Sequence, residues 1–358
     1  MVLVTLAQMA PHALPDPVAG AIFALAAAAL LGWNVGPLKL MLAGALSGAL
    51  RECIDAVEAA FREHADGKLD RPGILGMHVP AGSFHVKAAS LNSYFAAKTN
   101  ANFPGNAAAH GLPTIQGAIL LFGASDGRLL AIMDSAEVTA LRTGATTGVA
   151  TRRLAKRSAS TLALIGCGAQ SGAQLRAVAA VRTLRRVLVS DMDTARAERF
   201  AEEQGKALGI AIEVAKDLPA ALAVSDICVT CTTSRRYIID HAWVAPGCFI
   251  AAVGADNEHK QEIDPALFRA ARVVVDSLEQ CATIGDLHHA LDAGVMTRGE
   301  VHAELGEIVA GRKPGRQSES EIILFDSSGV ALGDVAAAAV VYERALERGG
   351  GAFVRLTD

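Results

Sequence analysis

Between residues 85 and 133 the chain alternates short apolar and polar runs that are typical of extended strands. Two extended runs, 85–91 and 94–100, precede two apolar runs, 118–123 and 129–133, which flank the turn 124–127 with its Asp-Gly pair. Runs of this length joined by a glycine-containing turn predict β-hairpins. We therefore expect an antiparallel sheet in the first third of the chain.

Helical spacing flanks this region on both sides. Residues 51–67 place apolar side chains three and four positions apart, as one face of an amphipathic helix does. Asp134 followed by Glu137 is similar to a capping box and predicts the start of a long helix that runs to about Leu154.

From Ser160 onward, apolar runs alternate with helical segments, which is the pattern of a parallel sheet covered by helices. The expected strands are 161–165, 186–190, 225–230, 248–253 and 272–275. The run 321–325 and the helix 333–348 resemble the first region more than this one. We therefore predict an α/β protein in which a Rossmann-type domain (146–320) is inserted into a discontinuous α+β domain for substrate binding and dimerisation (37–145 plus 321–358).

The run 160–172 passes from apolar residues into two closely spaced glycines, Gly166 and Gly168, and the next apolar run ends on Asp191. A strand, a tight turn, a helix and a second strand ending on an acid indicate a dinucleotide-binding unit. Asp191 can accept hydrogen bonds from both ribose hydroxyls and would repel a 2′-phosphate, which favours NAD. Arg196 lies a few residues on and offers a phosphate contact, so NADP stays open.

Composition narrows the functional class. The 358 residues are 51% hydrophobic and 20% charged, which fits a globular protein with room for two domains. A net charge of −4 leaves no basic footprint, so nucleic acid is not an expected partner. The six cysteines lie mostly in apolar runs, as reduced thiols of a cytoplasmic protein do. We expect the pair Cys228 and Cys231 to belong to a buried strand.

The N-terminal segment is apolar and alanine-rich from residue 18 to 31. No Lys or Arg precedes Lys39, so a secretory signal is not indicated. The uninterrupted run is shorter than the ~20 residues that a membrane-spanning helix needs. We expect residues 1–36 to be an extension outside the domain, with a docked helix or a weak membrane anchor as alternatives.

Five ordered segments carry a family resemblance over roughly residues 38–346. They are 95–106 (FAAKTNANFPGN), 133–143 (MDSAEVTALRT), 166–170 (GCGAQ), 253–256 (VGAD) and 325–331 (FDSSGVA). Together they resemble the ornithine cyclodeaminase and mu-crystallin family. The resemblance implies a homodimer that binds NAD(H) or NADP(H) and acts on α-amino or α-imino acids, with the first domain supplying both the substrate site and the dimer interface.

The same resemblance assigns substrate-binding and catalytic roles. Arg142 corresponds to the family's carboxylate-binding arginine, whose planar guanidinium suits a bidentate grip, and Arg71 to a second such arginine. Lys98 matches the active-site lysine. Burial would lower its pKa, so that it could exchange protons with the substrate nitrogen. Lys87, on the preceding strand, competes for this role.

Further site residues follow from the motifs. Asp256 comes after a strand, at the carboxyl edge of the parallel sheet where ligands bind, and resembles the family's catalytic aspartate. Asn106 is implied as a substrate contact. The implied cofactor contacts are Gly166, Gly168, Ala169, Gln170, Asp191, Thr232, Val253 and Ser327. We predict no metal site, because His288 and His289 are adjacent on a helix and should point to different faces.

Three reactions fit hydride transfer at the α-carbon. They are cyclisation of ornithine to proline with loss of ammonia, oxidation of a short amino acid as in an alanine dehydrogenase, and reduction of a cyclic imine. In the family, a glutamate before a Met-Pro pair would hold the distal ammonium of ornithine. The corresponding stretch 74–80 contains no carboxylate, which favours a small or cyclic substrate. A non-catalytic NAD(P)H-linked binding protein of the crystallin type is the alternative from another class.

Overall fold

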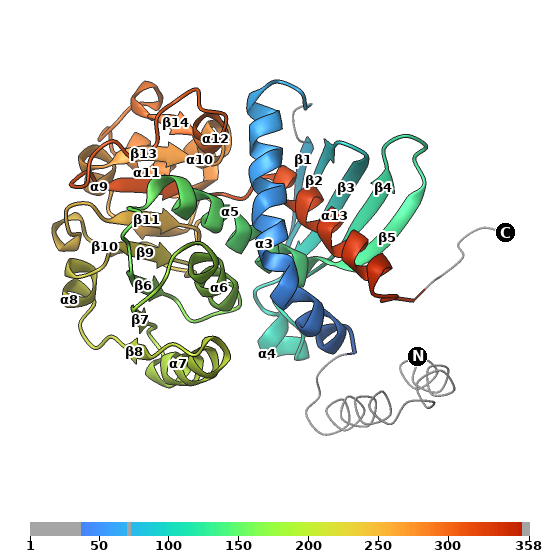
Figure 1. Ribbon diagram of the computed structural model, residues 1–358, viewed down its shortest axis with the longest axis horizontal. Helices are drawn as coiled ribbons and strands as arrows, with labels where there is room; N and C mark the ends of the chain where they lie inside the picture. The colour runs from blue at the N-terminus through green and yellow to red at the C-terminus, as the bar shows by residue number, and fades with distance from the viewer. Residues whose placement is uncertain (1–36, 70–72, 353–358) are drawn as a thin grey trace. The chain divides into compact units, whose positions relative to one another are not determined.

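The computed structural model describes residues 37–69 and 73–352 (Figure 1). The described residues divide into two compact units, with the boundaries between residues 49 and 50 and between residues 342 and 343. Every described strand lies between these two boundaries. The other unit contains, among the described residues, the beginning of helix α3 (Pro37–Ala65) and the end of helix α13 (Ala331–Glu347). Residues 1–36, predicted to be an extension, lie outside the described residues.

The first region forms the expected antiparallel sheet, a five-stranded meander in the order β1-β2-β3-β4-β5. Its strands are β1 (Gly73–Val79), β2 (Gly82–Leu91), β3 (Tyr94–Asn102), β4 (Ile115–Gly123) and β5 (Leu129–Asp134). The short helix α4 (Asn106–His110) lies in the connection between β3 and β4. Because side chains alternate along each strand, the sheet has two faces. The inner face carries Lys87, Lys98 and Ile119, and the outer face carries Leu75 and Ile132.

The inner face changes character along its strands. At one end it is apolar and buried, and Ile119 and Leu121 have no exposed surface. Burial of each such side chain contributes about 1.5–3 kcal/mol. Further along the same face, the register pairs Lys87 with Lys98, and then His85 with Asn100. The core face therefore ends in a row of polar and cationic side chains.

Helix α5 (Ser135–Leu154) begins where the sequence predicts. The Asp134 carboxylate accepts hydrogen bonds from the backbone N–H groups of Ala136 and Glu137, as an N-cap does. Helix α5 packs on α6 (Ser171–Val181), and a Cβ at Gly144 would lie 2.8 Å from the carbonyl oxygen of Ala173. Glycine at this position therefore permits the close approach of the two helices.

The second sheet has eight strands, and all of its neighbouring pairs are parallel. Its order is β14-β13-β15-β11-β9-β6-β7-β8, and the central strands are fully buried, as near-continuous apolar runs predict. The strands are β6 (Thr161–Ile165), β7 (Arg186–Ser190), β8 (Ile212–Val214), β9 (Ile227–Thr230), β11 (Phe249–Ala252), β13 (Arg272–Val275), β14 (Ala303–Glu304) and β15 (Ile323–Asp326).

Helices connect these strands, as a Rossmann-type sheet requires. After α6 they are α7 (Thr194–Leu208), α8 (Leu218–Ala223), α9 (Pro265–Ala270), α10 (Leu278–Ile284), α11 (Asp286–Asp292) and α12 (Leu305–Val309). The two short strands β10 (Arg235–Ile239) and β12 (Gln261–Ile263) pair in parallel, and two 3-10 turns, η1 (His241–Trp243) and η2 (Arg298–Glu300), complete the region. Cys228 lies in β9 and is buried, as predicted, whereas Cys231 follows the last residue of β9 and is only partly buried.

One strand lies in a different sheet from the one that the sequence pattern suggests. We predicted that the run 321–325 belongs with the first region, but β15 lies between β11 and β13 in the centre of the parallel sheet. All four of its residues are buried. An uninterrupted apolar strand of this kind can be covered on both faces, whereas the strands of the antiparallel sheet alternate.

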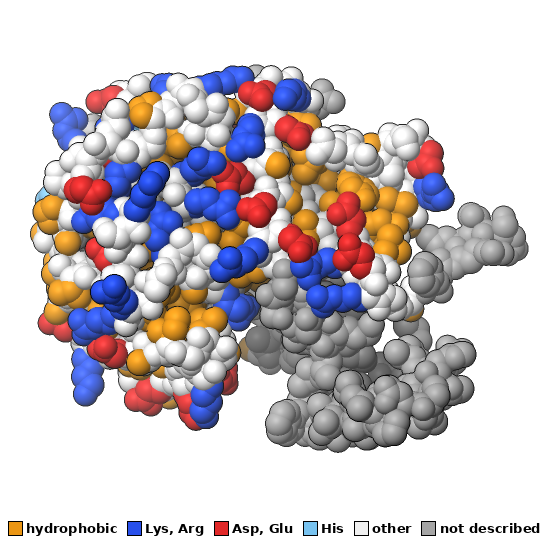
Figure 2. Space-filling model, viewed as in Figure 1, with side chains coloured by type: hydrophobic (Ala, Val, Ile, Leu, Met, Phe, Trp, Pro, Cys, Tyr) orange, Lys and Arg blue, Asp and Glu red, His pale blue; other side chains and the backbone are white. Residues whose placement is uncertain are grey.

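Charges of both signs are mixed on the visible surface of the parallel-sheet region. On the face shown in Figure 2, Lys and Arg side chains are interspersed with Asp and Glu over the parallel-sheet region. In residues 37–69 and 73–352, no helix combines the length and apolar character that a membrane crossing demands.

Candidate functional site

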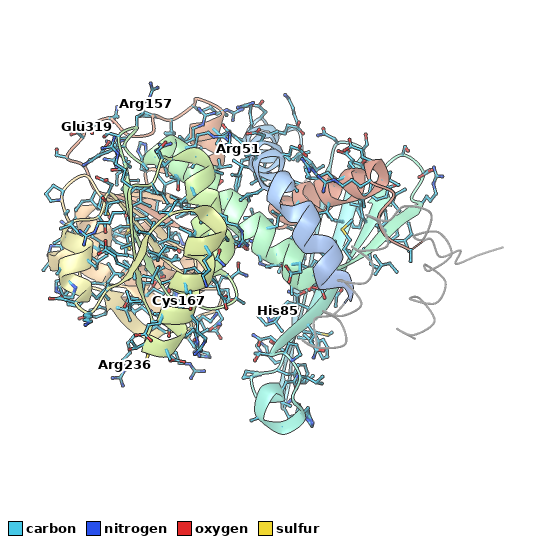
Figure 3. The ribbon with its side chains drawn as sticks, turned by 60° about the horizontal axis from the view of Figure 1, so that its bottom comes forward. Arg51, His85, Arg157, Cys167, Arg236 and Glu319 are labelled. Carbon is cyan, nitrogen blue, oxygen red and sulfur yellow. The ribbon has the colours of Figure 1, made fainter. Side chains whose placement is uncertain are left out.

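The turn after β6 has the geometry of a dinucleotide-binding turn. Gly166 has φ +93°, and a Cβ there would lie 2.8 Å from the Thr232 side chain, so only glycine fits. A Cβ at Gly168 would meet no heavy atom within 4 Å, which leaves room for a phosphate beside the start of α6. Cys167, between the two glycines, is labelled in Figure 3. Ala169 is exposed, and Gln170 is the N-cap residue of α6.

Asp191 follows β7 and lies directly beside this turn. One oxygen of its carboxylate accepts the backbone N–H of Cys167 at 2.8 Å, and the other accepts that of Asp193 at 2.9 Å. The Arg196 guanidinium is 3.9 Å away. Each carboxylate oxygen has a second lone pair, so Asp191 keeps acceptor capacity for ribose hydroxyls.

The other predicted cofactor residues lie at the same edge of the sheet. Thr232, Val253 and Ser327 follow the carboxyl ends of the neighbouring strands β9, β11 and β15. Because parallel strands end at one edge, the fold brings these residues to the side of the Gly166 turn. The residues present thus fit a dinucleotide at this edge.

Two buried carboxylates that we did not assign as site residues hold these loops. Glu262 accepts the Thr230 hydroxyl and the backbone N–H groups of Thr232 and Gly254. Asp276 accepts both serine hydroxyls of the 327–329 loop and the backbone N–H of Gly329. Burial raises the pKa of Glu262, while its hydrogen bonds oppose the rise. Each carboxylate thus holds a loop that carries one predicted cofactor residue, Thr232 for Glu262 and Ser327 for Asp276.

A second cluster joins the antiparallel sheet to the C-terminal helix. Lys98 Nζ lies 2.7 Å from Asp334 Oδ1, and Arg142 Nε lies 2.9 Å from the same oxygen. All three side chains are buried, and Lys98 also donates to the Thr139 hydroxyl. Asp334 Oδ2 is buried and accepts no hydrogen bond from the described residues. The fold therefore brings Lys98 and Arg142 together through a carboxylate that the sequence analysis missed.

The cluster shifts the pKa values of its members. Burial lowers the pKa of Lys98 from 10.5 to about 8, although the Asp334 carboxylate opposes this change. Burial would raise the pKa of Asp334, but the charges of Lys98 and Arg142 outweigh it and lower that pKa below 3.8. Lys98 is therefore a group that can gain and lose a proton near neutral pH, which suits acid–base catalysis.

Lys87 connects the antiparallel sheet to the loop that follows β15 in the parallel sheet. Its Nζ donates a 2.7 Å hydrogen bond to the carbonyl oxygen of Gly329, in the loop after β15. Burial and the Arg142 charge lower the pKa of Lys87, while Asp334, Asp276 and Asp256 act in the opposite direction. The side chain thus lies in the electrostatic field of both the cationic cluster and the loops at the sheet edge.

The remaining predicted residues make fewer contacts. Asp256 is half exposed and forms an ion pair with Lys260 at 2.7 Å, and it acts electrostatically on Lys87 and His85. No contact joins it to Lys98 or Arg142 among the described residues. Asn106 begins α4 and donates to the carbonyl oxygen of Pro113. Arg71 lies outside the described residues. The roles of these three remain predictions.

The histidine pair is arranged differently from our prediction. The ring centroids of His288 and His289 lie 3.7 Å apart with the ring planes tilted by 39°, so the two side chains pack against each other rather than point to separate faces. Each ring contacts a different backbone carbonyl, that of Gly285 for His288 and that of Lys260 for His289. The direction of each ring is thus set by these contacts, which helical spacing alone does not report.

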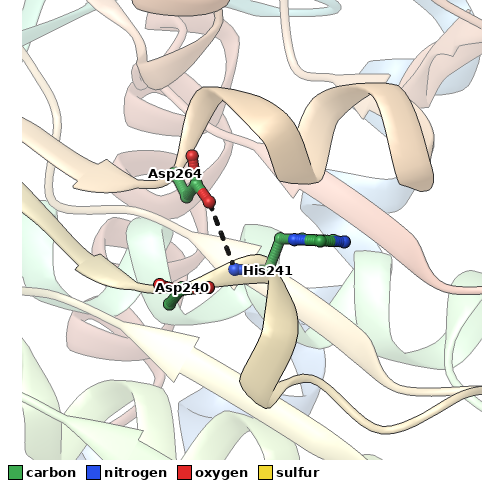
Figure 4. A group of neighbouring side chains, drawn as sticks. All are labelled: Asp240, His241 and Asp264. Atoms are coloured by element: carbon green, nitrogen blue, oxygen red, sulfur yellow. Dashed lines mark hydrogen bonds between the residues drawn. The ribbon is translucent and has the colours of Figure 1, made fainter.

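Figure 4 shows a separate acidic group, formed by Asp240, His241 and Asp264. Asp240 caps η1 by accepting the Ala242 N–H, and Asp264 caps α9 by accepting the Ala266 N–H. Both carboxylates therefore have a structural role in these helix starts.

The site matches a known family. The model of the ornithine cyclodeaminase/mu-crystallin family matches residues 44–349. The chain belongs to this family. The resemblance drawn from the five motifs and the predicted fold class are thereby confirmed.

Three solved structures of the family are similar over nearly their whole length. An archaeal alanine dehydrogenase dimer with bound NAD is 37% identical, with a TM-score of 0.82, covering 86% of this chain and 95% of that one. Thermococcus litoralis Δ1-pyrroline-2-carboxylate reductase, in complex with NADH and L-proline, is 37% identical with a TM-score of 0.81 (85% and 96% covered). Paracoccus denitrificans iminosuccinate reductase, in complex with NAD⁺, is 32% identical with a TM-score of 0.78 (84% and 93% covered).

The residue that the sequence analysis missed carried a visible signal. Asp334 is the only charged residue in the run 331–341 of helix α13, which is otherwise alanine, valine, leucine and glycine. A lone carboxylate on an apolar helix needs a cationic partner when that helix is buried. The signal was therefore present, but it did not show which cations Asp334 would contact.

Proposed function

We propose that this protein is an NAD(H)-dependent oxidoreductase that transfers hydride at the α-carbon of a small amino or imino acid. One observation carries the proposal: Lys87, which lies opposite Lys98 in the antiparallel sheet, donates a hydrogen bond to Gly329, in the loop beside the dinucleotide edge. The contact links Lys98 and Arg142 to the strand ends that carry the cofactor residues. The solved relatives with NAD or NADH support the cofactor assignment.

Arg142, Lys98 and Asp256 have separate roles in the proposed reaction. A nicotinamide cofactor, when bound, accepts the hydride from an amino acid or supplies it to an imine. The terminal nitrogens of Arg142 hold the substrate α-carboxylate, while its Nε lies against Asp334 Oδ1. Lys98 takes the proton that leaves the amine as the C=N bond forms, or returns it to the nitrogen in the reverse direction. Asp256 is the second candidate acid–base group, from the loop after β11.

Charge at the site disfavours the ornithine reaction. The stretch 74–80 holds no carboxylate, and its exposed strand β1 pairs with the part of β2 that carries His85 and Lys87. The distal ammonium of ornithine would approach these basic groups without an acceptor. Oxidation of a small amino acid or reduction of an imine is therefore the favoured reaction type, as in the alanine dehydrogenase and imine reductase relatives.

A substrate panel that follows NADH absorbance tests the proposal. Ornithine, lysine, alanine and aspartate would be offered with NAD⁺, and pyrroline- and piperideine-carboxylates or pyruvate with ammonia would be offered with NADH. We expect turnover with a small or cyclic substrate and at least ~10-fold slower turnover with NADPH, because Asp191 would repel a 2′-phosphate. NADPH used as well as NADH would contradict the role of Asp191.

A non-catalytic binding protein is the competing function. Under that alternative no substrate of the panel would turn over, although NADH would still bind. The relatives that are an alanine dehydrogenase and an imine reductase favour catalysis over silent binding.

We further propose that the chain forms a homodimer through the outer face of the antiparallel sheet. This face exposes large apolar side chains, among them Leu75, Met77 and Ile132. The pairing register across all five strands places them on one side of the sheet. Apolar patches of this kind mark interaction sites, and the archaeal relative is a dimer.

Analytical ultracentrifugation can test this interface. The wild type should sediment as two 37.0 kDa chains, and Ile132→Glu should shift it toward the monomer by burying an unpaired charge. Val224→Glu, at an exposed apolar position of the parallel-sheet region, should leave the dimer intact. If the Ile132→Glu variant dimerises as stably as the wild type, the interface lies elsewhere.

A further inference from the structure

Lys87 is a partly buried ammonium group without a counter-ion. Its Nζ donates to the carbonyl oxygen of Gly329, and no carboxylate of the described residues comes within 4.0 Å of it. Lys98 and Arg142, by contrast, share Asp334. A cation that is withdrawn from water without an anion is unfavourable, so its retention points to a partner that the protein itself does not supply.

The strand register makes this arrangement more costly. Lys87 lies directly opposite Lys98 on neighbouring antiparallel strands, with both side chains on the inner face. Like charges at directly opposite positions repel each other. The single carboxylate of Asp334 contacts Lys98 and Arg142 and acts on Lys87 only through space, so one buried anion serves three cations.

Besides Asp334, two further carboxylates act on Lys87, and both have other partners. Asp276 accepts the two hydroxyls and one backbone N–H of the 327–329 loop, and Asp256 forms an ion pair with Lys260. Both act on Lys87 electrostatically without contacting it. The ammonium group therefore remains available to an anionic ligand.

The α-carboxylate of the substrate does not account for this cation. Arg142, whose fork geometry suits bidentate binding, takes that group. The Arg142 guanidinium packs on Gly329, the same residue whose carbonyl oxygen receives the Lys87 hydrogen bond. One ligand could therefore reach both cations only if it carried two anionic groups a few bonds apart.

We infer that the substrate is a short dicarboxylic amino or imino acid, with its side-chain carboxylate bound by Lys87. The inference rests on the proposed function and narrows its substrate class. His85, labelled in Figure 3, precedes Lys87 by two residues on the same face of β2 and extends the polar surface. A neutral alkyl or ring side chain would instead leave the ammonium without an anion.

Steady-state kinetics with matched substrates tests the inference. L-aspartate and L-asparagine are nearly isosteric and differ in one negative charge. We expect kcat/KM for aspartate to exceed that for asparagine by about 30-fold or more, as loss of one partner of a desolvated charge pair predicts. Lys87→Met, which keeps the chain length but removes the charge, should abolish this preference, and Lys87→Arg should restore part of it. Lys206→Met, which replaces an exposed lysine paired with Glu202, is the matched control.

A binding measurement separates this inference from the proposed function. Calorimetry on the protein with NADH bound should show that succinate binds more tightly than butyrate, and that Lys87→Met removes the difference. Thermal unfolding of each variant checks that it folds. Turnover of alanine or asparagine at least as fast as that of aspartate, with equal binding of succinate and butyrate, would overturn the diacid substrate while hydride transfer stands. Tighter succinate binding without turnover of any substrate would support the role of Lys87 and overturn the proposed function.

Discussion

The Asp334→Asn variant should have a free energy of unfolding about 3–5 kcal/mol lower than that of the wild type. The substitution leaves Lys98 and Arg142 buried without their shared anion. Chemical denaturation at neutral pH measures this difference. Asp55→Asn is the control. Its carboxylate is exposed and pairs with Arg152 at the surface, so its loss should cost less than about 1 kcal/mol.

The acid dependence of stability gives this prediction a second measurement. The pKa of Asp334 is held below 3.8 by its two cations, so the carboxylate stabilises the fold at neutral pH and loses this contribution as pH falls through the lowered pKa. Asp334→Asn should lack that part of the acid-induced loss. Equal stability of variant and wild type at neutral pH would show that Asp334 does not neutralise the cluster.

Lys98→Ala should lower kcat/KM by about 10²- to 10⁴-fold, the range typical of a general acid or base, while NADH affinity stays within a few-fold. Lys98 contacts Asp334 and Thr139 rather than any residue of the dinucleotide turn, so cofactor binding should not depend on it. Stopped assays with excess enzyme measure the residual rate, and fluorescence titration measures NADH binding. Unchanged turnover would remove Lys98 from the mechanism.

The pH profile of the wild type should report the same group. The pKa of Lys98 is about 8, so amine oxidation, which needs the neutral amine form of Lys98, should speed up as pH rises through about 8. Imine reduction needs the ammonium form and should slow down over the same interval. Asp334 opposes the lowering of this pKa, so Asp334→Asn should move both inflections to lower pH.

Much of the fold follows from local patterns. The strands 161–165, 186–190 and 272–275 are predominantly apolar runs, and the structure has them with these bounds. The Gly166 turn and the Asp134 cap depend on backbone requirements that a few residues satisfy by themselves. Strand β15 is the exception, because an apolar run records burial and does not record which sheet supplies its neighbours.

In the candidate site, too, some residues follow from the sequence and others only from the tertiary structure. By itself, the sequence determined the family, and it predicted a dinucleotide turn, the acid that follows it, and Lys98 and Arg142 as site residues. Only the tertiary structure showed that Asp334 lies between these two cations and that Lys87 reaches Gly329, 242 residues further along the chain, without an anion of its own among the described residues. Charge balance in a buried site is a sum over residues that are far apart in sequence. It is decided by packing, and local periodicity carries no record of it.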